Sequence, residues 1–346
     1  MWQIIKKLFK STFFNISLIV LFTILVLIFT FKDDGNIVLD IISQVSIPML
    51  ILIIFINIID RFIHGIGLAI EAKESHPEYS YSQGFCNAYV AGLFCNITPS
   101  ASGGQVAQAY VFDKQGIPHV NSIGILWLDF IIYQSVMTIY VLVLLILKYR
   151  YFHSFYSEYF FVSILGFMVS AFIIVMLYLL AKSPKFYYFV CNKGLLILHK
   201  LHIIKDKEES VNKLNEQLSL FTEQIDRLSK NKKMLIQLVL INVIRLTIYY
   251  ALPFICAKAL KIDVSLNDLL NIIALSSFVA MVNAFLPMPG SAGGTEAVFV
   301  LMFSTIFKSV DAKSIMLLWR LLTYYLTILI GSIIFLFIKI KYREKL

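Results

Sequence analysis

Two glycine-rich interruptions in otherwise apolar sequence constrain the fold of this chain most strongly. Residues 98–105 run Thr-Pro-Ser-Ala-Ser-Gly-Gly-Gln, and residues 288–295 run Met-Pro-Gly-Ser-Ala-Gly-Gly-Thr. Each contains a proline, a few small residues and a glycine pair. Broken helical backbone at membrane depth is tolerated only where protein or a wet cavity covers the freed polar groups. A matched pair in the two halves of a membrane protein indicates a ligand site between internal repeats.

The composition places the chain in a membrane. It is 59% hydrophobic and 15% charged, with a mean hydropathy of +0.81, whereas soluble domains carry about 25% charged residues. Residues 11–31 contain no charge, which is long enough to cross a hydrocarbon core of about 30 Å. The segment is too long for a removable signal peptide and lacks a small-residue cleavage site. We therefore predict that it is the first span.

No feature of the sequence indicates a soluble enzyme. The chain has no P-loop, no G-x-S-x-G motif, no zinc-ligand spacing and no soluble region of domain size. Its four cysteines lack metal or redox spacing. Its six histidines are expected near span ends, where an isolated histidine is usually structural. We expect no catalytic residues, no cofactor and no metal.

The predicted fold is an all-α polytopic membrane protein with about six full spans and two re-entrant helical hairpins. Full spans are expected at residues 11–31, 37–59, 121–147, 159–181, 234–257 and 314–338. The first hairpin joins residues 85–96 to 105–111, and the second joins 269–286 to 295–307. A Pro/Gly motif forms each joint.

The spans group into one membrane domain with two repeat halves. Residues 1–181 form the first half, residues 182–233 form a loop, and residues 234–346 form the second half. An inverted-repeat architecture follows if the two hairpins open from opposite faces of the membrane.

The distribution of basic residues predicts the orientation. The formal net charge is +9, and 11 Lys and Arg residues lie in the 182–233 loop. Other basic clusters precede the first span and follow the last one. All of them fall on the cytoplasmic side only if both hairpins are re-entrant. We therefore expect a cell-membrane protein with both termini cytoplasmic, and we assign the positive charge to orientation and anionic lipid, not to nucleic acid.

The 182–233 loop contains one amphipathic pattern. Its apolar residues follow 3-4 spacing and are Val211, Leu214, Leu218, Phe221, Ile225 and Leu228. The pattern covers less than three heptads. It predicts a helix that lies on the membrane or on its own protein, and a homodimer contact stays open as the alternative.

The hairpin joints are the candidate binding sites. The second helix of each hairpin starts after a glycine pair, and a helix N-terminus offers unpaired N–H groups to an anion such as a phosphate headgroup. The candidates are Thr98, Ser100, Ser102, Gly103, Gly104, Gln105 and Tyr110 in the first hairpin, and Pro289, Gly290, Gly293, Gly294, Thr295 and Glu296 in the second. The alternative is close packing, because small residues let membrane helices approach each other.

Charged residues inside the predicted spans extend the candidate site. They are Asp129, Arg245 and Arg320, and intramembrane charges are usually functional because they are costly. An arginine fork matches a phosphate bidentately, so we expect Arg320 or Arg245 to hold a lipid phosphate with Glu296 as a partner or proton carrier. A structural Arg–Glu or Arg–Asp pair stays open as the alternative.

At these motifs the chain resembles the flippase-like membrane region of the lysylphosphatidylglycerol synthase family. Residues 96–110 resemble the family's first motif, residues 283–296 its second, and residues 319–325 the Arg-x-x-Thr-Tyr segment of its last span. Other branches of the family carry an acid and an arginine after the first glycine pair. Gln105 and Gln108 fill that region here.

The resemblance implies a role in lipid movement. In bifunctional members a soluble domain transfers lysine from aminoacyl-tRNA to phosphatidylglycerol, and the membrane region moves the product outward. That soluble domain is expected to be missing here. The expected function is to bind and translocate an anionic or aminoacylated phospholipid, or a polyprenyl-phosphate headgroup. The alternatives are a membrane component of lysylphosphatidylglycerol synthesis and an envelope scaffold.

Overall fold

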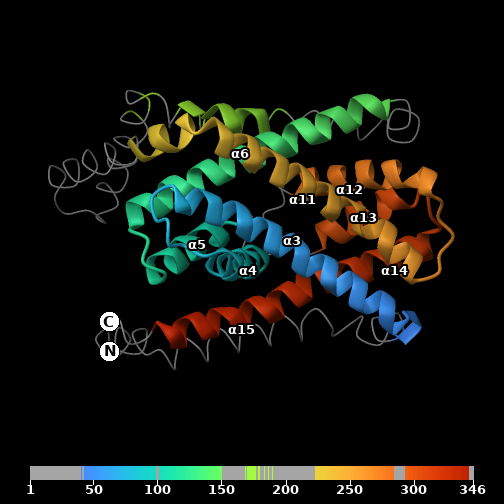
Figure 1. Cartoon of the computed structure of the whole chain (residues 1–346). Coiled ribbons are helices and arrows are strands. Elements are labelled where there is room, and N and C mark those ends of the chain that lie inside the picture. The colour runs from blue at the N-terminus through green and yellow to red at the C-terminus, as the bar shows by residue number, and fades with distance from the viewer. Residues whose placement is uncertain are drawn as a thin grey trace, which may run out of the picture.

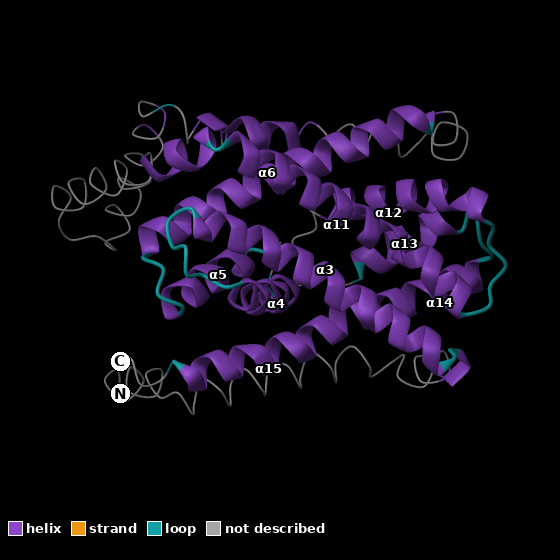
Figure 2. Ribbon diagram, in the orientation of Figure 1, coloured by secondary structure: helices purple, strands orange, loops and turns teal. Residues whose placement is uncertain are grey.

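The computed structural model describes residues 40, 43–98, 101–149, parts of 168–189, 223–283 and 293–342, and these contain helices and no strand. Four helical runs within these residues are long and apolar enough to cross a membrane. They are α3 (Ile47–Lys73), α6 (His119–Leu147), α11 (Lys232–Ala259) and a continuous run from Ser309 to Lys341. The prediction of an all-α polytopic membrane protein is therefore confirmed (Figures 1 and 2).

The run from Ser309 to Lys341 consists of three elements. These are α14 (Ser309–Arg320), the five-residue π-helical segment η2 (Leu321–Tyr325) and α15 (Leu326–Lys341).

Three of the other predicted features fall wholly or mostly outside the described residues. They are the span at 11–31, the span at 159–181 and the amphipathic helix that begins at Val211.

Helix α3 differs from the predicted second span. The prediction placed this span at 37–59 and left Arg61 in a loop, but the helix begins at Ile47 and continues to Lys73. Proline in the first turn suits a helix start because its missing N–H would have no partner there, and Pro48 occupies this turn. The helix continues past Asp60 and Arg61 because they contact buried partners instead of water. The predicted boundary was therefore wrong.

Two pairs of shorter helices form the predicted hairpins. The first pair is α4 (Tyr81–Ile97) and α5 (Gly103–Lys114). The second is α12 (Leu269–Asn283), which follows the 3-10 turn η1 (Leu266–Asp268), and α13 (Gly294–Phe303). Helices of 12 and 10 residues, as in α5 and α13, rise about 15–18 Å, roughly half of a hydrocarbon core.

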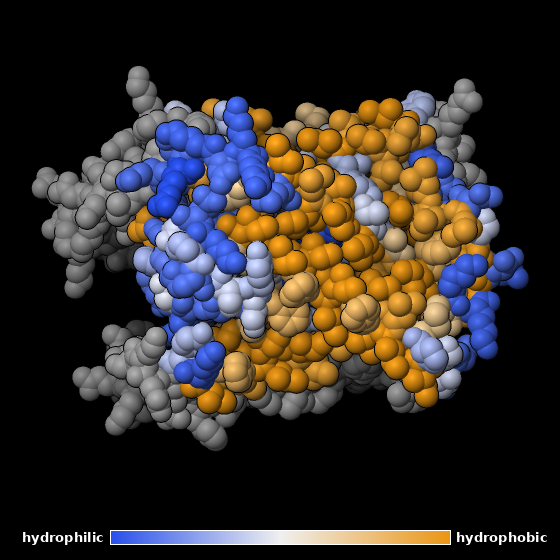
Figure 3. All heavy atoms as spheres, in the orientation of Figure 1, coloured by the Kyte–Doolittle hydropathy of each residue, from blue (hydrophilic) through white to orange (hydrophobic). Residues whose placement is uncertain are grey.

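The two hairpins lie toward opposite ends of the molecule. In Figure 1, α4 and α5 lie at the left with the dark-red end of α15, whereas α12 and α13 lie at the right with the orange end of α11. Figure 3 shows an apolar band on this face, with hydrophilic residues at the left and right ends. The long helices therefore run from one hydrophilic end to the other, and each hairpin enters the band from a different end.

Helix α4 packs closely between α3 and α15 through glycines. A Cβ added to Gly84 would clash with the carbonyl oxygen of Gly65 on α3. A Cβ added to Gly331 on α15 would lie 2.8 Å from the Cβ of Leu93. Membrane helices associate through such small residues because dispersion contacts replace the hydrophobic effect there.

Candidate functional site

An ion pair connects the second hairpin to the last span. Arg320 is the last residue of α14, and Glu296 lies in the first turn of α13. The Nε atom of Arg320 lies 2.8 Å from Oε1 of Glu296, and their side chains are 8% and 28% exposed. The guanidinium carbon also lies 5.0 Å from the ring centroid of Tyr324. The structure therefore brings together two of the predicted site residues.

The helix changes its winding directly after Arg320. The segment η2 has π-helical hydrogen bonding, which is frequent at functional sites within longer helices. The hydroxyl of Thr323 donates to the carbonyl oxygen of Trp319 at 2.8 Å. Such a side-chain bond satisfies a carbonyl that widened winding can leave without an N–H partner. The π-helical winding starts at the residue after Arg320, next to the ion pair.

The first hairpin is attached to the same segment. The side-chain amide of Asn96, near the end of α4, donates to the carbonyl oxygen of Tyr324 at 3.3 Å. The hydroxyl of Tyr324 donates in return to the carbonyl oxygen of Asn96 at 3.3 Å. The end of α4 is therefore held a turn beyond Arg320, so that both hairpins make contact with the region around η2.

The described part of the second joint is open. Gly293 has φ = 82°, and an added Cβ would meet no atom of the described residues within 4 Å. Glycine is required there by backbone conformation and not by crowding. Thr295 is buried, with 1% of its surface exposed. Pro289 and Gly290 lie outside the described residues.

The described part of the first joint is closed by its own side chains. The Thr98 hydroxyl accepts from the N–H of Gly103 at 2.9 Å and donates to the carbonyl oxygen of Phe94 at 2.5 Å. A Cβ at Gly103 would lie 2.5 Å from Cγ2 of Thr98, and one at Gly104 would clash with Sγ of Cys95. These contacts give Thr98, Gly103 and Gly104 a packing role, as the alternative interpretation expected.

The remaining predicted residues of this hairpin do not gather at the joint. Ser102 and Gln105 are exposed, and Ser100 lies outside the described residues. The ring centroids of Tyr110 and Phe335 lie 6.0 Å apart. Nζ of Lys114 lies 5.7 Å from the centroid of the Tyr110 ring. Tyr110 therefore belongs to the interface between α5 and α15. Binding of lipid by these residues stays a prediction.

A second ionic cluster lies near the middle of α3. Oδ1 of Asp60 lies 3.4 Å from Nε of Arg245 on α11, and its Oδ2 lies 3.5 Å from Nε of Arg61. Nε2 of His64 lies 3.7 Å from Oδ2 of Asp129 on α6. The predicted residues Arg245 and Asp129 thus have different partners, both supplied by α3.

Sequence reasoning missed the α3 members of this cluster. It ended the span at residue 59 and expected the histidines at span ends, whereas His64 lies within the helix and its side chain is 11% exposed. Asn57, Asp60, His64 and Glu71 follow one another at intervals of three, four and seven residues. This places all four on one helix face, and that periodicity is the signal that could have found them.

The two ionic clusters share one aromatic neighbour. Tyr249 of α11 interacts electrostatically with Arg320, Arg61 and Asp60, and its ring lies 6.1 Å from that of Trp319. The Arg245 guanidinium lies 5.2 Å from the ring of Tyr133. Arginine prefers such aromatic faces because of the ring quadrupole. The interior is therefore polar from the second hairpin to the centre of α3.

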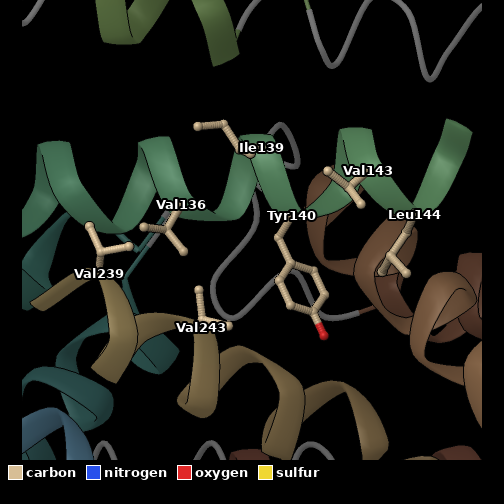
Figure 4. A pocket seen from close by; sticks show the side chains of 7 residues that line it. All are labelled: Val136, Ile139, Tyr140, Val143, Leu144, Val239 and Val243. Carbon is tan, nitrogen blue, oxygen red and sulfur yellow. The ribbon is translucent and has the colours of Figure 1, made fainter. Parts of the chain in front are cut away.

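An apolar groove of about 370 Å³ lies between α6 and α11. Figure 4 shows side chains from both helices around it, and they are Val136, Ile139, Tyr140, Val143, Leu144, Val239 and Val243. The Tyr140 hydroxyl pairs with Oγ1 of Thr247 at 2.9 Å. Because its lining is otherwise aliphatic, the groove suits an acyl chain better than a headgroup.

These features define an all-α integral membrane protein whose broken hairpins contact buried ion pairs. The profile of the family described as the lysylphosphatidylglycerol synthase TM region matches residues 16–331, and the chain belongs to this family. The resemblance stated from the motifs is thereby confirmed. No curated protein and no solved structure matches the chain.

Proposed function

We propose that the chain binds the headgroup of an anionic or aminoacylated phospholipid between its two hairpins and helps it to cross the bilayer. The observation that carries this proposal is the Arg320–Glu296 pair beside the open Gly293 joint. Family membership supports a lipid of the lysylphosphatidylglycerol type. The protein then acts in the cell membrane, with both termini cytoplasmic.

The pair offers complementary charges to such a headgroup. Arginine presents a planar fork of donors that matches a phosphate. Oε2 of Glu296 has no hydrogen-bond partner among the described residues, and a carboxylate oxygen accepts readily from an ammonium group. A lysylated phospholipid carries both a phosphate and amino groups. Arg320 would bind the phosphate while Glu296 accepts from an amine.

The apolar groove supplies a place for the rest of the lipid. It lies on α6 and α11, which also carry Asp129 and Arg245. An acyl chain can stay against Val136 and Val243 while the polar headgroup moves through the protein interior. This separation avoids exposing the headgroup to hydrocarbon, which is the main barrier to spontaneous lipid movement.

A vesicle assay tests the proposal. The purified full chain is reconstituted into vesicles of phosphatidylcholine and phosphatidylglycerol that contain fluorescent phosphatidylglycerol in both leaflets. A membrane-impermeant reductant quenches only the outer leaflet. We expect nearly complete quenching with the protein and about half without it. Lysylphosphatidylglycerol added to the same vesicles should slow the labelled lipid by competition. Equal quenching in protein-containing and protein-free vesicles would contradict the proposal.

A further inference from the structure

The strongest unexplained feature is a fully buried carboxylate on α3. Glu71 has 0% of its surface exposed, and neither of its side-chain oxygens has a hydrogen-bond partner among the described residues. It belongs to none of the ion pairs described above. A lone buried carboxylate is strongly disfavoured in its charged form. Glu71 therefore needs a ligand that neutralises it.

Glu71 lies at one end of a polar stripe that follows α3. The stripe consists of Asn57, Asp60, His64 and Glu71, and it extends for about 21 Å at 1.5 Å per residue. This length is roughly two thirds of a hydrocarbon core. Asn57 and Asp60 are also buried, at 2% and 3% exposure. Buried ionisable residues along one face of a membrane helix are typical of ion or proton pathways.

Asp129 connects the middle of the stripe to Glu71. It lies 3.7 Å from His64 and also interacts electrostatically with Glu71. His64 and Glu71 are two helical turns apart on the same face, or about 10 Å along the axis. Asp129 of α6 therefore contacts His64 directly, and its charge also acts on Glu71.

The charges of the interior leave room for one additional positive charge. Four carboxylates lie wholly or partly buried in the described spans and hairpins, those of Asp60, Glu71, Asp129 and Glu296. Three guanidinium groups lie among them, those of Arg61, Arg245 and Arg320, and they too are wholly or partly buried. One proton, on either His64 or Glu71, makes this set neutral. Histidine is suited to exchange a proton near neutral pH.

Two arginines set the environment of the His64–Asp129 pair, and they are Arg61 of α3 and Arg245 of α11. The groups that interact with these arginines include Asp60 of α3, Tyr249 of α11, Tyr133 of α6, and Tyr89 and Cys95 of α4. None of the α4 groups is a carboxylate or a base near neutral pH. His64, Asp129 and Glu71 are therefore the members that can exchange a proton without breaking an arginine pair.

Polar contacts continue beyond Glu71 toward the hydrophilic end. Ser75 accepts a hydrogen bond from the Gln224 side chain at 2.9 Å. Gln224 is buried and lies over Gly124, where an added Cβ would be 2.6 Å from its Cγ. The Gln224 amide of the helical segment 223–230 thus covers the end of α3, where the hydroxyl of Ser75 is a polar group through which a proton can pass.

We propose that His64, Asp129 and Glu71 form a proton-binding relay inside the membrane domain. One proton is taken up at this relay from one side of the membrane and released to the other, and this exchange is coupled to lipid movement. The coupling rests on the proposed function, whereas the proton site itself does not. A metal ion is a poorer ligand, because the described residues contain no group of three His, Cys, Asp or Glu side chains that could hold one.

Infrared difference spectroscopy tests the proton site without any lipid transport. The full chain in nanodiscs is titrated between acidic and alkaline pH, and the carbonyl band of protonated carboxyl groups is followed. We expect Glu71→Gln to remove a buried, pH-dependent component of this band. Glu78→Gln is the matched control, because it makes the same substitution at an exposed position seven residues away. An unchanged titration in Glu71→Gln would refute the site.

A vesicle experiment tests the coupling. A pH gradient across the membrane should change the initial rate of fluorescent lipid movement several-fold for the wild type and for Glu78→Gln, but not for Glu71→Gln. Replacing sodium by choline should change nothing; a loss of the rate would instead indicate sodium as the ligand. Lipid movement that ignores the gradient refutes coupling and leaves the proposed function intact. No lipid movement, together with a normal infrared titration, refutes the proposed function and leaves the proton site intact.

Discussion

Asn96 and Tyr324, 228 residues apart, exchange two hydrogen bonds through their side chains and main-chain carbonyls. One residue lies near the end of α4 and the other in the π-helical segment of the last span. This reciprocal contact holds the first hairpin against the segment that follows Arg320. It makes the position of the first hairpin sensitive to any change in the last span.

Loss of this contact should destabilise the protein. Tyr324→Phe removes one neutral hydrogen bond and should lower the free energy of unfolding by about 1 kcal/mol. Asn96→Ala removes the other bond, from its side-chain amide to the carbonyl oxygen of Tyr324, and should have a similar cost because the main-chain carbonyl of residue 96 remains. In a double-mutant cycle measured by thermal unfolding in detergent, the two changes should be non-additive. Tyr81→Phe is the control, because Tyr81 is an exposed residue. Additive effects would show that the two residues act independently.

The Arg320–Glu296 pair allows a structural role to be separated from headgroup binding. Arg320→Ala leaves the partly buried carboxylate of Glu296 without its partner. The loss of a partner costs about 3–5 kcal/mol for a fully buried pair, and this value is the upper bound here. If the role is structural, Arg320→Lys should also lower the melting temperature, and Glu296→Gln with Arg320→Gln should recover much of it. If Arg320 binds a headgroup, Arg320→Lys should fold normally while lipid movement falls.

The matched control for this series is Lys313→Ala, which removes an exposed cation from the same helix. It should change neither the melting temperature nor lipid movement. Wild-type stability together with wild-type lipid movement in Arg320→Ala would exclude both roles for Arg320.

The opposed hairpins predict the sidedness of two lysines. Lys114 ends α5, and Lys261 follows the end of α11 by two residues. Cysteines placed at these positions, in a variant without native cysteines, should be labelled from opposite sides of intact cells. Position 114 should be protected from an impermeant reagent and position 261 should react with it. Labelling of both positions from the same side would exclude the inverted arrangement.

The two glycine joints should respond differently to alanine. Gly104→Ala should lower the melting temperature because its Cβ meets Sγ of Cys95, and Cys95→Ala should restore part of the loss. Gly293→Ala should cost about 1–2 kcal/mol through its positive φ alone. No space-making substitution among the described residues should rescue it, because none of their atoms lies within 4 Å of that Cβ. If Cys95→Ala does not raise the melting temperature of Gly104→Ala, the packing explanation is wrong.

The sequence alone determined the class and the local breaks of this protein. Long uncharged stretches specify membrane helices because hydrocarbon cannot hydrogen-bond a bare backbone. The two Pro/Gly motifs placed both hairpins close to their observed positions, since their backbone cannot continue a helix. Residues 121–147 and 234–257 correspond to α6 and α11 within two residues at each end.

Only the tertiary structure decided which charges lie inside and what they contact. A one-dimensional hydropathy pattern treats Asp60 and Arg61 as the end of a span, although Arg245 from a distant helix compensates Asp60. It also cannot tell that a Cβ at Gly104 meets Cys95, whereas a Cβ at Gly293 meets no atom of the described residues within 4 Å. Pairing energies and close contacts depend on distances between separate helices, and those distances exist only once the helices have packed.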